Sequence, residues 1–231
     1  MSTSKLLELF QSMERGESVE TLLYNELQQG IKNKSCNVLN IVENLGILLV
    51  NKETSLRKKG TEILSKYLAM LDKDHLTEQE LEFLVAFYCD RLKDHHSIIP
   101  DILLGLYHLC DMKQLPQDAY LKLYPAVFLN FNCQSQLIED RKMFYNILFK
   151  CMQHNISGLK PMGPDFVYGV IQSIDGERDP RNLLFLFTSL IPLFFNHFEL
   201  YHLGEEMFDI MACYFPVDFR PVRFENKYFI C

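Results

Sequence analysis

The sequence of 231 residues lacks most motifs by which nucleotide-binding, hydrolytic and metal-binding proteins are identified. It contains no glycine-rich phosphate loop, no Gly-x-Ser-x-Gly and no His-Glu-x-x-His. Its seven cysteines are odd in number, and none belongs to a Cys-x-x-Cys motif. Most of them lie in apolar helical sequence, which is typical of reduced, buried thiols in a cytosolic or nuclear protein.

Positive charge is also scarce. The chain has 23 basic and 30 acidic residues and a formal net charge of −7. Direct nucleic-acid binding is therefore not expected, because neutralising phosphates requires a basic surface. The local exception is a basic cluster that we interpret as the solvated face of a helix, namely Lys52, Arg57, Lys58, Lys59 and Lys66.

Long apolar runs are absent as well. Glu8, Glu14 and Arg15 interrupt the N-terminal region, so no secretory signal is expected there. The most apolar stretch runs from Leu183 to Phe195, contains Pro192 and is too short to cross a bilayer. These features predict a soluble intracellular protein with no membrane contact.

Apolar residues at helical spacing fill almost the whole chain, and no segment alternates with the period of a β-strand. Thr77 and Glu80 form a capping-box pattern at one helix start, and Gly30 is a plausible stop for another helix. The breaker-rich segment Asn155–Gly163 predicts a loop. The expected helices are residues 4–15, 18–29, 37–50, 55–71, 77–94, 98–112, 116–131, 137–153, 164–175, 180–196 and 199–214. The sequence thus predicts an all-α fold of about eleven antiparallel helices.

The spacing of the polar turns indicates a repeat. We take Ser55, Ser97, Asp140 and Asp179 as the starts of successive second helices, which gives steps of 42, 43 and 39 residues. A helix pair every ~40–47 residues is the signature of HEAT or armadillo repeats. We therefore predict an α-α superhelix, a solenoid of antiparallel helix pairs.

The repeat spacing predicts a single solenoid domain made of several helix-pair repeats. Residues 1–35 are expected to form N-terminal capping helices, followed by helix-pair repeats at 36–74, 75–115, 116–157 and 158–198 and an incomplete terminal repeat at 199–231. The next turn would fall at Asp218. Because terminal repeats need polar caps, we expect an exposed apolar face near Phe208, Met211 and Tyr214, and a chain that is the front piece of a longer solenoid.

Two turns are dense in charged residues, and equivalent turns of a solenoid line up along one edge. They are expected to form a charged ridge that holds successive repeats together or contacts a partner. The first role is favoured, because stacked repeats need such contacts. The ridge residues are Asp90, Arg91, Lys93, Asp94, His95 and His96 in one turn, and Asp175, Glu177, Arg178, Asp179 and Arg181 in the other.

A metal site at Cys89, His95 and His96 is a weaker interpretation. Adjacent histidines on a helix point roughly 100° apart, so both cannot easily face one ion together with the cysteine. We therefore predict no metal ligands, no cofactor and a buried thiol at Cys89.

Acid–base catalysis by Asp175, Glu177 and Asp179 is weaker still. The sequence offers these carboxylates no nucleophile and no identifiable pocket. Asp179 followed by Pro180 is better explained as a helix cap, and Asp175 with Gly176 as a helix end. We predict no catalytic residues and no enzymatic activity.

Three stretches of the chain resemble one known family in the family's own order. Tyr88–Pro100, Gly169–Leu184 and Cys213–Phe219 are similar to the N-terminal region of the HEAT-repeat adaptor of the cytosolic iron–sulfur assembly (CIA) targeting complex. That family is also named for nucleotide excision repair and transcription. The resemblance covers most of the chain up to about Phe219 and is weaker before Leu81.

The resemblance implies a non-enzymatic scaffold in cytosol and nucleus. Its implied partners are the WD40-propeller and small-subunit members of the targeting complex, and its clients are iron–sulfur apoproteins such as helicases, polymerases and primase. Family members continue through many more repeats, and their assembly surface is attributed chiefly to the C-terminal region. The alternative is a generic HEAT scaffold of trafficking or phosphatase assemblies.

Overall fold

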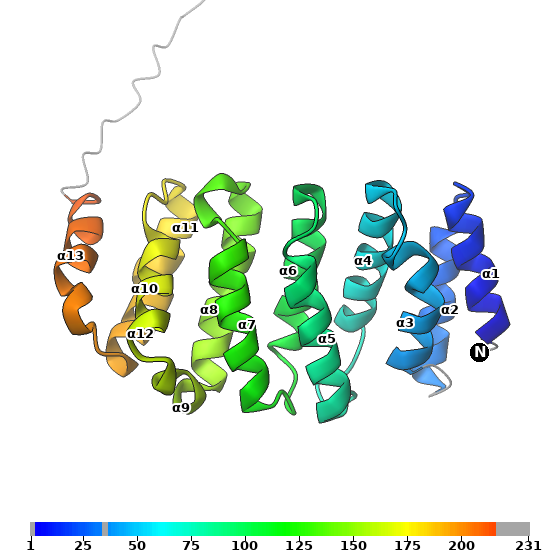
Figure 1. Ribbon diagram of the computed structural model, residues 1–231, viewed down its shortest axis with the longest axis horizontal. Helices are drawn as coiled ribbons and strands as arrows, with labels where there is room; N and C mark the ends of the chain where they lie inside the picture. The colour runs from blue at the N-terminus through cyan, green and yellow to red at the C-terminus, as the bar shows by residue number, and fades with distance from the viewer. Residues whose placement is uncertain (1–2, 34–36, 216–231) are drawn as a thin grey trace, which may run out of the picture.

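The computed structural model describes residues 3–33 and 37–215, which form helices joined by short turns and contain no β-strand (Figure 1). The predicted all-α superhelix of about eleven helices is confirmed, since α11 and α12 continue one another and α9 is a single turn. The helices are α1 (Thr3–Glu14), α2 (Glu20–Lys32), α3 (Val38–Leu49), α4 (Thr54–Ala69), α5 (Glu78–Arg91), α6 (Ile99–Leu109), α7 (Gln117–Asn130), α8 (Ile138–His154), α9 (Ile156–Leu159), α10 (Gly163–Ile174), α11 (Pro180–Phe185), α12 (Ile191–His197) and α13 (Gly204–Ala212).

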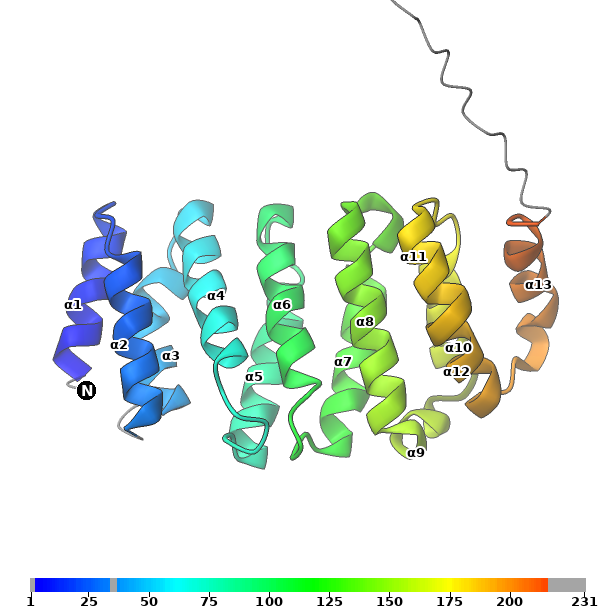
Figure 2. The ribbon, with the colours of Figure 1, turned by 180° about the vertical axis from the view of Figure 1, so that it is seen from behind.

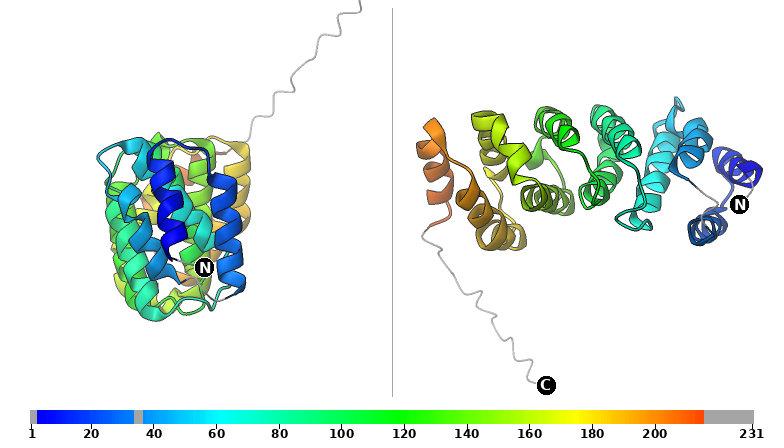
Figure 3. Two further views of the ribbon diagram at one scale, coloured as in Figure 1. Left: turned by 90° about the vertical axis from the view of Figure 1, so that its right-hand side faces the viewer. Right: turned by 90° about the horizontal axis from the view of Figure 1, so that it is seen from below.

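The helices form two layers. The layer nearer the viewer in Figure 1, here called the front layer, contains α1, α3, α5, α7, α10 and α13. The back layer, seen in Figure 2, contains α2, α4, α6, α8 and the continuous α11–α12. Figure 3 shows the two layers end-on and from below. Some helices pack on their own partner, as α3 does on α4 and α5 on α6. Contacts with the next pair run within a layer, as between α4 and α6, α6 and α8, and α5 and α7.

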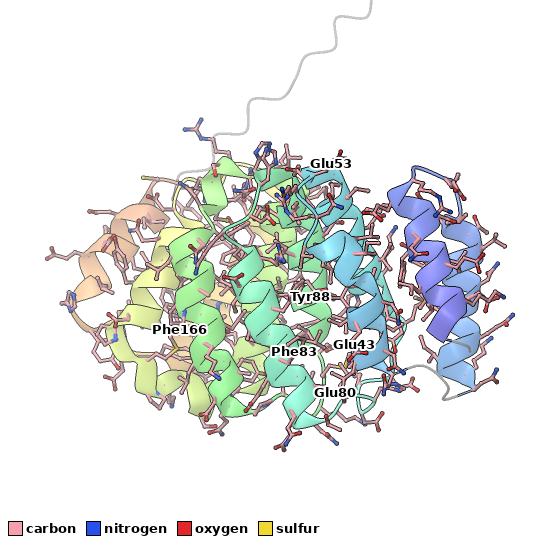
Figure 4. All side chains as sticks on the ribbon, turned by 45° about the vertical axis from the view of Figure 1, so that its right-hand side comes forward. Glu43, Glu53, Glu80, Phe83, Tyr88 and Phe166 are labelled. Atoms are coloured by element: carbon pink, nitrogen blue, oxygen red, sulfur yellow. The ribbon has the colours of Figure 1, made fainter. Side chains whose placement is uncertain are left out.

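The core is the continuous seam between the layers. Large aromatic side chains fill it, and Tyr88 on α5 and Phe166 on α10 are labelled in Figure 4. Tyr124 on α7 meets Phe166 edge-to-face, with ring centroids 4.9 Å apart. Because such rings bury much apolar area and prefer this geometry, they stabilise the contact between the third and fourth helix pairs.

Local capping residues define several helix starts. The capping box at α5 is present as predicted, with Glu80 accepting from the Thr77 N–H at 2.9 Å. The Asn37 side chain accepts from the Asn40 N–H at the start of α3. Asp179 accepts from the backbone N–H groups of the first turn of α11, which is the cap predicted from its position before Pro180.

The structure differs from the predicted boundaries at several places, and three of them have an identifiable local cause. α2 passes Gly30 and ends at Lys32, because the Asn33 N–H still bonds to a carbonyl in the last turn. The predicted loop at 155–163 contains the short α9 and a 3₁₀ turn, capped by the Asn155 side chain. Between α11 and α12, residues 186–190 form a π turn just before Pro192, where a proline disturbs regular helical bonding.

The C-terminal face is partly apolar. Phe208 is exposed, whereas Met211 and Tyr214 are half-buried. Tyr214 donates to the carbonyl of Ile174 at 3.4 Å, and its ring packs edge-on against Phe187. The turn predicted at Asp218 lies outside the described residues.

Close packing at Gly105 on α6 provides a test of the seam. A methyl group at Gly105 would overlap the ring of Tyr88. Hydrogen bonds hold this ring in place, because the Tyr88 hydroxyl donates to Ser65, and Ser65 donates to the Asp101 carbonyl. Gly105→Ala should lower the free energy of unfolding by about 1–3 kcal/mol through overpacking. Urea unfolding followed by circular dichroism measures this.

The matched control is Gly46→Ala in α3, where a methyl group would meet no atom within 4 Å. This substitution should stabilise the chain by about 0.5–1 kcal/mol, because alanine loses less backbone entropy in a helix. Equal effects of the two substitutions would contradict the packing assigned to Gly105.

Candidate functional site

The turns that join the two helices of each pair follow one another along one edge of the solenoid, the upper edge in Figure 1. They comprise residues 50–53, 92–98, 131–137 and 175–179. The two charged turns of the predicted ridge both lie on this edge, with the turn at 131–137 between them. The structure separates the ridge residues into those that join repeats and those that face solvent.

Asp94 joins the second repeat to the first. The Arg57 guanidinium from α4 donates to both carboxylate oxygens of Asp94, at 2.9 and 2.7 Å. Arg91 and the His95 N–H add hydrogen bonds at 3.1 and 2.7 Å. These donors, Arg57 foremost, hold the pKa of Asp94 well below its ordinary range. Asp94 is thus a charged contact between repeats.

Glu177 joins the fourth repeat to the third. Its side chain is 0% exposed, and Arg141 from α8 donates to its two oxygens, each at 2.8 Å. The Tyr145 hydroxyl and the Asn182 amide donate at 3.0 and 3.1 Å. The backbone N–H groups of the two following residues complete the set, so every side of this buried carboxylate meets a donor.

Burial and hydrogen bonding act in opposite directions on Glu177. Burial raises its pKa, but the hydrogen bonds from Arg141, the following backbone N–H groups and Asn182 together lower it from 4.5 to about 2. Glu177 is therefore charged near neutral pH, and its charge stabilises the folded state.

The Arg57–Asp94 and Arg141–Glu177 contacts have the same design, and we call each of them an Arg–carboxylate clamp. Arg57 and Arg141 are each the fourth residue of their helix, and each also donates to carbonyls of the turn before it. Their carboxylate partners lie 37 and 36 residues further along the chain. One clamp joins the first and second repeats, and the other joins the third and fourth.

The opposite edge joins the second repeat to both of its neighbours. Asp111, after α6, lies 2.7 Å from the Lys73 ammonium of the first repeat and 3.2 Å from that of Lys150 on α8. Lys150 also lies over the Tyr107 ring, 3.6 Å from its centroid. The Asp111 contacts therefore bridge the repeats between the two clamps.

The remaining ridge residues have local roles or face solvent. His95 accepts from the Ser97 N–H through Nδ1 and caps a short 3₁₀ turn, and Arg181 pairs with Asp179 at 3.1 Å. These contacts explain the local shape of the turns. The exposed members are Asp90, Lys93, His95, His96, Asp175, Arg178 and Arg181.

Sequence reasoning missed the partners of the clamps. Arg57 and Lys58 were expected on a solvated helix face, but Arg57 reaches Asp94 and Lys58 lies 3.5 Å from Asp101 of the next repeat. Arg141 was not identified at all. The available signal was an arginine in the first turn of a second helix with a carboxylate about one repeat later.

The described cysteines are mostly buried. Burial raises the pKa of the Cys89 thiol to about 11, which disfavours the reactive thiolate. In residues 3–33 and 37–215, no group of three or more His, Cys, Asp or Glu side chains is arranged to hold a metal ion, and no helix is long and apolar enough to cross a membrane. Of the cysteines described, Cys213 is exposed, and Cys89, Cys110, Cys133 and Cys151 are buried.

Glu177→Gln tests the buried clamp. Because the folded pKa of Glu177 is below its unfolded value, its charge contributes stability that is fully present above about pH 4.5 and lost as the pH falls toward 2. The substitution should cost on the order of 2–3 kcal/mol near neutral pH. Chemical unfolding at a series of pH values should show the difference from the unsubstituted chain shrinking over that window.

Glu139→Gln is the control on the same edge, since Glu139 is exposed and its ion pairs are 3.7 and 3.9 Å long. Its effect should stay within about 0.5 kcal/mol at every pH. A Glu177→Gln cost that does not change with pH would contradict the charged state assigned to Glu177.

Comparison with known proteins identifies the family. The family model described as MMS19_N, Dos2-interacting transcription regulator of RNA-Pol-II, matches residues 42–230. The MMS19 nucleotide excision repair protein of Drosophila melanogaster is 41% identical over 215 residues, which cover 92% of this chain and 22% of that protein. The homologs of Xenopus laevis and Homo sapiens are 41% and 38% identical over 85% of this chain and 19% of their own lengths. The chain spans about a fifth of these relatives. It belongs to the MMS19 family and corresponds to the N-terminal region of that family.

Proposed function

We propose that this chain is a non-catalytic scaffold segment of the CIA targeting complex. In this role it helps to deliver iron–sulfur clusters to apoproteins of DNA replication, repair and transcription. Its partners would be the WD40-propeller and small subunits, and its clients helicases, polymerases and primase. It would act in both nucleus and cytoplasm.

Membership in the MMS19 family is the observation that carries this proposal. The relatives are named for nucleotide excision repair, and the family description names a transcription regulator. A single scaffold that serves repair and transcription enzymes accounts for both names, because several such enzymes need an iron–sulfur cluster from the same assembly route.

The fold supports a scaffold role. A two-layer solenoid exposes an extended surface relative to its mass, which suits it to contact several partners. The clamps and the Asp111 contacts join successive repeats, so that residues on different repeats keep a defined spacing. Such rigidity lowers the entropy lost when a partner contacts several repeats together.

Affinity capture tests the proposed complex. The purified 231-residue chain, immobilised through a tag, should retain the purified WD40-propeller and small subunits and an iron–sulfur helicase apoprotein. The matched control is the same chain with Arg57→Glu and Arg141→Glu, which disrupts the repeat geometry. Its capture should fall by about tenfold, because misaligned contact residues lose affinity together.

Failure of both the 231-residue chain and a longer family member to retain these proteins would contradict the proposal. Retention of a trafficking or phosphatase subunit in their place would favour the generic HEAT scaffold.

A further inference from the structure

Charge is divided unequally between the two layers of the solenoid. The front-layer helices α3, α5, α7, α10 and α13 carry ten acidic and two basic side chains. The back-layer helices α4, α6, α8, α11 and α12 carry eight basic and four acidic side chains. Among these ten helices, the negative charge is therefore concentrated on the front layer.

The two sets of charges also differ in how they are paired. All eight basic side chains of α4, α6, α8, α11 and α12 form ion pairs with neighbouring carboxylates, including the two clamps. Of the ten acidic side chains on α3, α5, α7, α10 and α13, nine form no ion pair with a described residue, and Asp90 pairs with Lys93 at 3.8 Å. The front face thus presents carboxylates that the chain itself does not neutralise.

A row of large apolar side chains crosses this acidic face. Each is the fifth or sixth residue of its helix, so the row follows the N-terminal halves of these front-layer helices. Figure 4 shows Phe83 on α5, with Glu80 on the same helix and Glu43 on α3. We call the row the front stripe; its members and exposed fractions are Phe83 51%, Leu121 42%, Tyr168 51% and Phe208 70%.

Every member of the front stripe has an acidic residue three positions before it, which places the two on one side of the helix. The four acid–apolar pairs are Glu80 with Phe83, Asp118 with Leu121, Asp165 with Tyr168, and Glu205 with Phe208. The helix dipole accounts for acidic residues in a first turn. It gives no reason for an exposed apolar side chain beside each of them, and a repeated apolar row on a surface indicates an interaction site.

The third pair borders a groove between α7 and α10. The groove has a volume of about 860 Å³, and its lining includes Phe128 and Leu129 of α7, Tyr168 and Asp165 of α10, and Met162. Gly169 lets the Phe128 ring lie against the backbone of α10. A space of this size can take several apolar side chains of a partner.

We propose that the front stripe and this groove bind a basic amphipathic helix of a partner protein. Neighbouring solenoid helices lie ~10 Å apart, a distance that an α-helix covers in roughly seven residues. A partner helix lying across the front layer would therefore present one apolar residue per heptad to the stripe. A lysine or arginine next to each of these apolar residues would pair with the acidic residue of the corresponding acid–apolar pair. One apolar side chain enters the groove next to Tyr168. This assignment goes beyond the proposed scaffold role and does not depend on the targeting complex.

A designed peptide tests the proposal. The probe is a fluorescein-labelled helical peptide of about three heptads, with one leucine per heptad flanked by lysines. Fluorescence anisotropy with the 231-residue chain should show saturable binding that weakens as salt is raised, because exposed charges are screened. The same peptide with glutamate in place of lysine should not bind.

Two protein variants locate the binding site. The front variant, Asp165→Lys with Tyr168→Ser, should weaken binding of the lysine peptide by about tenfold. The back control, Glu139→Lys with Leu184→Ser, makes the same change in charge and apolarity at exposed back-layer residues and should change binding by less than about twofold. A second front variant, Glu205→Lys with Phe208→Ser, should act like the first. Circular dichroism checks that each variant keeps its helices.

Equal weakening by the front and back variants would overturn the proposal, because it would indicate attraction to net charge alone. Unchanged binding in both front variants, or no binding of the lysine peptide, would also overturn it. So would self-association of the chain that the front variants abolish, since the face would then serve a second copy.

Discussion

The repeat geometry of this chain depends on an arginine that reaches from one helix pair to a carboxylate in the next. In a solenoid each repeat contacts only its neighbours, so no long-range packing corrects a rotation between two of them. The apolar seam supplies most of the stability but is weakly directional. The Arg57–Asp94 and Arg141–Glu177 clamps fix the orientation of one repeat relative to the next, because a guanidinium and a carboxylate bind each other in one planar arrangement. Asp111 then bridges the repeats between them.

The clamps also explain why the two layers differ on their surfaces. The basic residues of α4, α6, α8, α11 and α12 pair with carboxylates of the chain itself, on the same helix, on neighbouring helices or in the turns. Nine of the ten acidic residues on α3, α5, α7, α10 and α13 have no such partner among the described residues, so that face keeps its negative charge. One layer therefore holds the repeats together, and the other presents charge and apolar side chains to the surroundings. This division suits a scaffold, because contacts with a partner need not break contacts between repeats.

Much of the fold follows from local sequence, whereas the clamps do not. The capping box at Thr77 and the cap at Asp179 involve residues within three positions of each other, and the repeat spacing needs only the turns. Arg57 and Asp94 are 37 residues apart, and their contact depends on how two helix pairs stack. For the same reason the sequence placed Lys58 on a solvated helix face and predicted no role for Arg141. The acid–apolar pairs are visible in the sequence, but their exposure on one layer emerges only from the stacked helices.

A double-mutant cycle measures the clamp most directly. The free energy of unfolding is compared among the unsubstituted chain, Arg141→Gln, Glu177→Gln and the double variant, and likewise for Arg57→Gln with Asp94→Asn. Each pair should show a coupling energy of about 1 kcal/mol or more, and Arg141 with Asp94, which belong to different clamps, should be additive within about 0.3–0.5 kcal/mol. Additivity within both clamps would contradict the account, because the repeats would then be aligned by apolar packing alone.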